Sequence, residues 1–223
     1  VMQGRLEDAL DEINHSLIRN WHNHKARALK IAILRRMGKR EEALRWIKDS
    51  LSIDKFNFAC YYEKYLVTNT SEDLTSLKEM LRKEAHNYDE IALDYFGAGC
   101  WMEAVSLWKV AIDEAANTPM TYYYLGWSLL HGGFGGVQQA FADAANVCPD
   151  YCFPNRLEAI LALRCAMKEN PCDAKASYYL GNLYYDKRQY SLAIEAWETS
   201  IKLDDKFPTI WRNLALAYFN KKD

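Results

Sequence analysis

The sequence contains few of the residues that interrupt helices: of its 223 residues, five are proline and ten are glycine. Proline inside a helix removes a hydrogen bond and clashes with the preceding turn, so its scarcity permits long helices. Apolar residues recur at intervals of three and four along most of the chain, whereas the strict alternation typical of strands is scarce. The composition therefore predicts an all-α fold.

Long hydrophobic runs are also missing. No stretch approaches the roughly 18 apolar residues that a membrane-spanning helix needs. The first residues, VMQGRLEDALDEI, are amphipathic and acidic, unlike a signal peptide. We expect no membrane partner, and any export signal would have to lie outside this chain.

An excess of one charge is absent as well. The 28 lysines and arginines nearly balance the 30 aspartates and glutamates, and the charges are scattered rather than grouped. A protein that binds nucleic acid through its backbone usually carries a basic patch. We therefore expect no nucleic-acid partner.

Paired cysteine motifs are lacking among the six cysteines, none of which forms a CxxC pair or has a histidine at zinc-finger spacing. A metal site is therefore not expected. Since most of these thiols lie in apolar helical sequence, we expect free, buried cysteines in a reducing compartment and favour the cytoplasm. The six are Cys60, Cys100, Cys148, Cys152, Cys165 and Cys172.

An internal repeat emerges near the C-terminus. The segment SYYLGNLYY begins at Ser177. A similar segment, PTIWRNLALAYFN, begins at Pro208, one period of about 34 residues after Ala174. Together with Ala193 and Trp197 between them, these segments resemble the tetratricopeptide repeat family. The resemblance implies an α-solenoid of helical hairpins that form an irregular right-handed superhelix.

The spacing of small and large residues has a steric reason. Gly181 and Ala193 are small, so they allow the two helices of a hairpin to approach closely. Leu180, Tyr184 and Trp197 are large and fill the space around that contact. The same small position in successive second helices falls at residues 9, 43, 77, 104, 137, 159 and 193.

One of the intervals between these positions is too short for a hairpin. The stretch from Val137 to Ala159 is the shortest of them, and it includes CPDYCFPNR, in which two prolines oppose a long helix. We expect a single α-solenoid over 1–223 with an irregular elbow near 148–155.

The chain begins within a second helix and ends with a first helix. Trp211, Leu214 and Tyr218 of that last helix would therefore be partly uncovered, because each hairpin buries its apolar face on a neighbour. We expect the chain to be a segment of a longer protein. A homodimer formed through the uncovered terminal helix is a further hypothesis.

A second resemblance covers residues 153–223. This run resembles the repeat region of large bacterial proteins that carry a β-rich, sugar-enzyme-like domain on the N-terminal side. The resemblance implies an alternative function, that of a regulatory or substrate-positioning helical domain of a larger carbohydrate-active protein.

Signatures of catalysis are absent: the sequence contains no HExxH, GxSxG or GxxxxGK[ST] motif. The glycine-rich HGGFGG at 131–136 lacks the lysine and the preceding strand of a phosphate-binding loop, so we interpret it as a turn. His22 and His24 are interpreted as part of a solvated turn rather than a metal pair. We expect no enzyme activity and no cofactor.

The tetratricopeptide resemblance implies that first helices line a concave groove. Asn182 and Asn213 match two asparagines with which many family members hold an extended peptide, and an amide can both donate and accept a hydrogen bond. The leading hypothesis is a scaffold that binds a protein or peptide, from another chain or from its own polypeptide. For the groove aromatics, packing between helices is the alternative to binding. The candidate binding residues are Tyr123, Trp127, Lys175, Tyr178, Asn182, Tyr185, Arg212 and Asn213.

Overall fold

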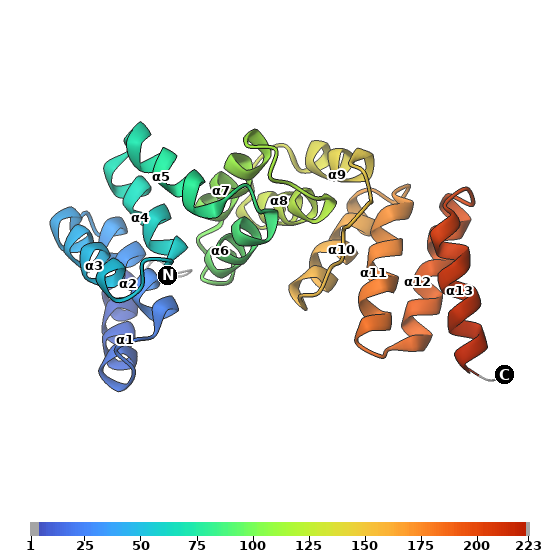
Figure 1. Ribbon diagram of the computed structural model, residues 1–223, viewed down its shortest axis with the longest axis horizontal. Helices are drawn as coiled ribbons and strands as arrows, with labels where there is room; N and C mark the ends of the chain where they lie inside the picture. The colour runs from blue at the N-terminus through green and yellow to red at the C-terminus, as the bar shows by residue number, and fades with distance from the viewer. Residues whose placement is uncertain (1–4, 222–223) are drawn as a thin grey trace. The chain divides into compact units, whose positions relative to one another are not determined.

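The computed structural model describes residues 5–221, which form thirteen α-helices and no strand (Figure 1). The all-α prediction is confirmed. The helices are α1 (Leu6–Arg19), α2 (His24–Arg36), α3 (Arg40–Ile53), α4 (Phe58–Thr68), α5 (Ser71–Leu81), α6 (Ala85–Gly97), α7 (Trp101–Asp113), α8 (Pro119–Gly132), α9 (Val137–Asn146), α10 (Glu158–Glu169), α11 (Ala174–Asp186), α12 (Tyr190–Leu203) and α13 (Pro208–Lys221).

The chain divides into two compact units, Val1–Leu107 and Trp108–Asp223, with the division inside α7. Each unit is described by itself. A single solenoid over 1–223 stays a prediction. Within 5–221 no helix is long and apolar enough to cross a membrane.

In the first unit, neighbouring helices pack as successive hairpins. Helix α2 packs against α1, α3 and α4, and α4 packs against α3, α5 and α6. The first helices start in the same way: the side chain of Asn23 accepts from the Ala26 amide at 3.0 Å, and that of Asn57 accepts from the Cys60 amide at 3.3 Å. An asparagine at this position satisfies an amide that the helix leaves unpaired. The two caps are separated by one full repeat period, so the repeat is visible in the backbone.

A buried guanidinium fills the space between α2 and α3. Arg27 has no exposed surface, and its guanidinium carbon lies 4.9 Å from the ring centres of both Trp21 and Trp46. Its Nε donates to the Ser50 hydroxyl at 2.9 Å, and Nη2 pairs with Asp49. A cation between aromatic rings is stabilised by their negative faces, which explains how the charge is tolerated in the core.

A second buried network joins four helices of the first unit. The Arg35 guanidinium, on α2, bonds to the Glu63 carboxylate of α4 at 2.8 Å and to the Glu103 carboxylate of α7 at 2.9 Å. Arg36 binds Glu103 at 2.9 and 2.8 Å, and the Tyr95 hydroxyl of α6 donates to Glu63 at 2.6 Å. Two guanidinium groups therefore balance two carboxylates.

The network shifts the pKa of the carboxylate that α7 contributes. Burial raises the pKa of Glu103, but hydrogen bonds from Arg36 and Arg35 outweigh burial, so that the pKa lies below its ordinary value. The pKa of the Arg36 guanidinium is raised mainly by its hydrogen bond to Glu103. The ion pairs thus favour the charged forms of both partners.

In the second unit, helices α10, α11, α12 and α13 follow one another as packed neighbours (Figure 1). Helix α8 packs against both α9 and α10. Residues 147–157, between α9 and α10, form no helix and contain Pro149 and Pro154. Residues 147–157 thus provide no first helix to pair with α10. This agrees with the short interval between Val137 and Ala159.

The glycines of the hairpins lie directly against aromatic rings. A Cβ atom on Gly181 would lie 2.4 Å from Cδ1 of Trp197, and one on Gly126 would lie 2.6 Å from Cε1 of Phe141. Real Cβ atoms do not approach so closely, so glycine is required at both positions for the helices to pack at this distance. The expected pairing of a small residue with a large one is present in both hairpins.

The glycine-rich segment 131–136 contains the last two residues of α8 and the turn that leads to α9. Gly133 has φ of +68° and Gly136 has φ of +94°, in the region that favours glycine. Its backbone therefore explains the glycines without a phosphate ligand.

Two expectations about burial were only partly right. On α13, Trp211 and Tyr218 are about half exposed, but Leu214 is buried, as are Ile210 and Ala217 on the same side of the helix. Among the six free cysteines, Cys60, Cys100 and Cys152 are buried, whereas Cys148 and Cys172 are exposed. The exposed pair lies between helices, but so does the buried Cys152.

Candidate peptide-binding groove

Helix α11 presents three of the predicted residues on one face. Tyr178, Asn182 and Tyr185 are spaced by four and three residues, which brings them to the same side of a helix. The start of this helix is fixed by Asp173, whose Oδ1 accepts from the backbone amides of Lys175 at 2.9 Å and Ala176 at 3.2 Å. The cap thereby fixes the residue at which α11 begins.

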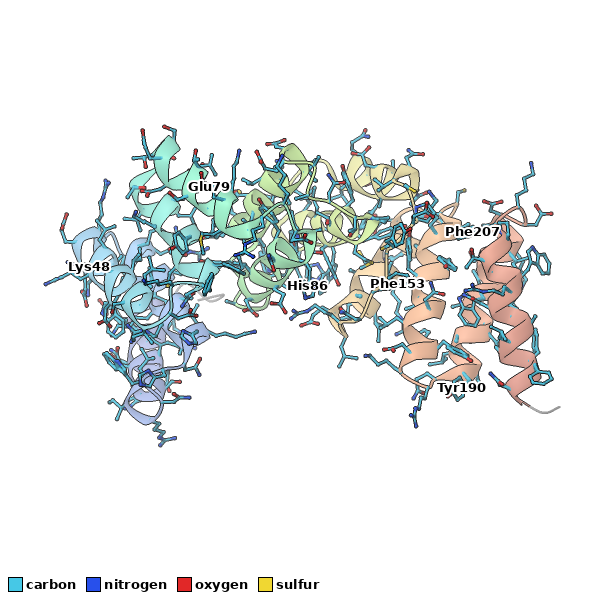
Figure 2. The ribbon with its side chains drawn as sticks, in the orientation of Figure 1. Lys48, Glu79, His86, Phe153, Tyr190 and Phe207 are labelled. Carbon is cyan, nitrogen blue, oxygen red and sulfur yellow. The ribbon has the colours of Figure 1, made fainter. Side chains whose placement is uncertain are left out.

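A hollow of about 300 Å³ lies over this face. Five of the eight predicted residues line it, so the structure brings most of the candidate set together. The loop before α10 contributes one wall through Phe153, whose side chain is labelled in Figure 2. The lining residues are Phe153, Tyr178, Asn182, Tyr185, Trp197, Arg212, Asn213 and Leu216.

A directed chain of hydrogen bonds crosses the floor of the hollow. The Asn182 Oδ1 atom accepts from Trp197 Nε1 and from Asn213 Nδ2, each at 3.1 Å. The Asn213 Oδ1 atom in turn accepts from Arg212 Nη2 at 3.1 Å. Indole and guanidinium groups only donate, so they fix which end of each amide is the oxygen.

This direction determines what the floor offers to a ligand. Since Asn182 Oδ1 already accepts two hydrogen bonds, its Nδ2 group is the part that remains, and it has no partner among residues 5–221. The sequence predicts that Asn182 both donates and accepts. The structure leaves it as a donor, which favours a ligand that presents carbonyl or carboxylate oxygens.

Tyr185 provides a further hydrogen-bond donor at one end of the hollow. Its hydroxyl oxygen accepts from Asn220 Nδ2 at 3.2 Å, which leaves its own proton for another acceptor. The ring lies 5.2 Å from that of Tyr190 and 5.5 Å from that of Trp197, between ring centres. Aromatic contacts of this kind hold the ring in one orientation.

The opposite end is apolar. Phe153 is 77% exposed, whereas Tyr178 is only 9% exposed because its ring packs 4.6 Å from that of Phe207, in the turn before α13 (Figure 2). Tyr178 therefore contributes an edge rather than a full face. The repeat pattern does not indicate Phe153, because this residue belongs to an irregular segment with no position in the repeat. The repeat pattern assigns Trp197 only to packing, yet this ring also touches the hollow.

Tyr123 and Trp127 do not line the hollow, which corrects their assignment to the groove. Tyr123 has no exposed surface and donates its hydroxyl to Asp173 Oδ2 at 2.7 Å, while Trp127 is 5% exposed and packs on His131. Helix α8 is covered by both α9 and α10, so side chains on more than one of its faces are buried. Both aromatic side chains pack between helices, which is the alternative to binding that the sequence leaves open.

Lys175 is also outside the hollow. Its ammonium group donates to the backbone oxygen of Val147 at 3.0 Å, in the segment between α9 and α10. This hydrogen bond holds the beginning of the segment that carries Phe153 against α11. The contribution of Lys175 to the site is positional rather than direct.

Burial changes the pKa values of the pair that anchors α8 to α11. Burial raises the pKa of the Asp173 carboxyl, although the Tyr123 hydrogen bond and two backbone amides oppose this effect. Burial, followed by the nearby Asp173 carboxylate, raises the pKa of Tyr123 well above its ordinary value. The phenol therefore stays protonated and continues to donate.

Most of the residues that line the hollow lie in the part of the chain that matches a known family. Residues 181–222 match the TPR repeat model. This segment is therefore similar to tetratricopeptide repeats. Six of the eight residues that line the hollow lie in it, and Phe153 and Tyr178 lie before it.

Several solved structures are similar to the chain over most of its length. MamA from Desulfovibrio magneticus RS-1 is 19% identical, with 90% of this chain and 86% of that chain covered and a TM-score of 0.32. YrrB, described as a TPR protein with an unusual peptide-binding site, is 16% identical, with 95% and 98% covered and a TM-score of 0.29. The TPR domain of P58(IPK) is also 16% identical, with 99% of this chain and 62% of that chain covered and a TM-score of 0.31.

Proposed function

We propose that the chain is a non-catalytic scaffold that binds an extended polypeptide segment of a protein partner through the hollow between α11 and α13. The segment that is similar to tetratricopeptide repeats supports this function, because its hairpins leave the faces of first helices side by side. The single observation that carries the proposal is the hydrogen-bond chain that leaves Asn182 Nδ2 as a donor at the floor.

The ligand's chemistry follows from the lining. An extended peptide presents a backbone carbonyl at every residue, and the donors on Asn182, Tyr185 and Arg212 suit such acceptors. Phe153 and Leu216 are more than half exposed, so each can cover an apolar side chain of the same peptide. A backbone segment with one apolar residue therefore fits both parts of the hollow.

Asn182→Asp is the sharpest test because it replaces an amide donor with a carboxylate acceptor of nearly the same size, although it also adds a negative charge. A carboxylate can still accept from Trp197 and Asn213, but it presents an acceptor where the wild type has a donor. Random peptides displayed on phage are selected on the full chain, and the affinity of the selected peptide is then measured by calorimetry. We expect Asn182→Asp to weaken binding by about tenfold or more, equivalent to ~1.4 kcal/mol.

Matched variants separate the groove from a general charge effect. Asn146→Asp makes the same chemical change at an exposed residue of α9, outside the hollow, and should leave the affinity unchanged. Arg212→Ala should weaken binding, since it removes both a donor and the group that orients Asn213. Equal affinity for the wild type and for Asn182→Asp would refute the proposal.

A further inference from the structure

The first unit contains a hollow of its own, bordered by small side chains from three segments. Ala28 lies on α2, Ala59 on α4 and Ala98 directly after α6, and together they border a space of about 350 Å³. Its size falls at the lower end of the range of ligand pockets, about 300–1,000 Å³. Larger residues at these three positions would fill it.

The wall of this hollow is largely apolar and aromatic. Phe56, Phe58 and Tyr95 contribute rings, and Leu29 and Ile91 contribute aliphatic surface. Phe56 is 63% exposed at the rim, so part of its ring is uncovered. Aromatic rings favour tilted or edge contacts with another ring, so the wall suits an aromatic guest.

The rim is acidic. Three carboxylates, Asp54, Glu90 and Asp94, and one lysine, Lys25, belong to the lining, so carboxylates outnumber ammonium groups there. Lys25 Nζ lies 2.7 Å from Asp94 Oδ1, so the only ammonium group of the lining is already paired. The hollow between α11 and α13 differs in this respect, because Arg212 is the only charged residue that lines it.

We propose that the first-unit hollow is a second binding site, which accepts an aromatic side chain of a partner polypeptide with a basic residue beside it. The aromatic ring enters the space bordered by Ala28, Ala59 and Ala98. The basic side chain lies at the rim, where it competes with Lys25 for Asp94. Complementary charge favours such a segment over one with an acidic neighbour. The proposal does not rest on the function assigned to Asn182.

Three short peptides test the chemistry. The probes are acetylated and amidated hexapeptides: Gly-Ser-Trp-Lys-Ser-Gly, the same peptide with Glu for Lys, and the same peptide with Ala for Trp. Each is titrated into the ¹⁵N-labelled full chain and followed by NMR. We expect the Trp-Lys peptide to bind most tightly and to shift the backbone amides of Leu29 and Ile91.

Variants of the ion pair test the rim without altering the core. Lys25→Ala removes the competitor, so the Trp-Lys peptide should bind about two- to fivefold more tightly, as expected for an exposed ion pair of ~0.4–1 kcal/mol. Asp94→Asn should weaken the binding of the same peptide. For the Trp-Glu peptide, Lys25→Ala should not tighten binding and Asp94→Asn should not weaken it. Both side chains are exposed enough for the fold to tolerate the changes.

Filling the hollow tests the site of the ring. Ala28→Phe should abolish the shifts at Leu29 and Ile91, whereas Ala215→Phe, at an exposed alanine of α13, should preserve them. If Ala28→Phe does not fold, the Lys25 and Asp94 variants still decide whether the peptide binds at this hollow. Equal binding of the Trp-Lys and Trp-Glu peptides, or no effect of Lys25→Ala, would overturn the proposal. Asn182→Asp should leave this binding unchanged, which separates it from the groove of the second unit.

Discussion

The side-chain amide of Asn213 donates to the side-chain oxygen of Asn182 at 3.1 Å, and this bond joins α13 to α11. The Trp197 indole donates to the same oxygen from α12. One oxygen atom thus connects three helices, and the Asn182 nitrogen has no partner among the described residues. Structure and binding in this region consequently depend on the same side chain, and different substitutions should separate them.

Asn182→Leu should destabilise the protein. Trp197 is 2% exposed, so its indole N–H would lose its acceptor inside the fold, at a cost of about 1–3 kcal/mol. Asn182→Asp retains an acceptor and should cost much less. Urea denaturation followed by tryptophan fluorescence compares the two variants. Equal losses would contradict the assigned direction of the hydrogen bonds.

Gly181→Ala should also be destabilising, because the new Cβ would lie 2.4 Å from the ring of Trp197. The overpacked contact should cost about 1–3 kcal/mol. Gly97→Ala is the matched control, since nothing lies within 4 Å of its new Cβ and α6 is helical there. This control should stabilise the protein by about 0.4–1 kcal/mol. Similar shifts in melting temperature for both variants would contradict the predicted close approach.

The ionic network of the first unit should make stability depend on acid. The pKa of Glu103 is lower in the folded state than its ordinary value of 4.5, so its contribution is complete above that value. The contribution is then lost as the pH falls through the folded-state pKa. Glu103→Gln should reduce the free energy of unfolding at neutral pH by about 3–5 kcal/mol, because it leaves two guanidinium groups under-compensated.

The pH dependence provides the control for this prediction. The difference between wild type and Glu103→Gln should become smaller as the pH is lowered below 4.5. Asp8→Asn, which breaks an exposed ion pair with Arg5, should change stability little at any pH. A difference that stays constant from neutral to acidic pH would show that the charge of Glu103 does not stabilise the fold.

Tyr123→Phe distinguishes a buried anchor from a binding residue. Removal of the hydroxyl takes a donor from Asp173, which is 4% exposed, and should cost about 1–3 kcal/mol of stability. Because Tyr123 lies outside the hollow, the selected peptide should bind the folded variant with unchanged affinity. Calorimetry at a temperature where the variant is fully folded makes this comparison. A loss of affinity without a loss of stability would indicate that Tyr123 is a binding residue of the groove.

Much of the fold could be predicted from the sequence, since the spacing of small and large residues is itself the packing rule. The pairing of Gly181 with Trp197 requires a hairpin, and Pro149 and Pro154 oppose a helix in the segment 147–157. The groove could be predicted in part: Asn182 and Asn213 meet as expected. Their hydrogen-bond direction could not be predicted, because it depends on the indole of Trp197 in three dimensions.

The remaining misassignments have a common physical cause. Repeat positions indicate the side of a helix, but they do not reveal how many neighbours cover it. Helix α8 is covered by α9 and by the extra helix α10, which buries Tyr123 and Trp127. Phe153 lies in the non-helical segment, where no repeat pattern applies, and the hollow of the first unit depends on three alanines distant in sequence.

The most direct test of the scaffold proposal is an NMR titration of the ¹⁵N-labelled full chain with the peptide selected on it. The side-chain amide of Asn182 and the indole of Trp197 are the reporters, and the indoles of Trp21 and Trp46 in the first unit are internal controls. The proposal predicts that the first pair shifts with the peptide concentration while the second pair does not. Shifts that leave Asn182 and Trp197 unchanged would contradict it.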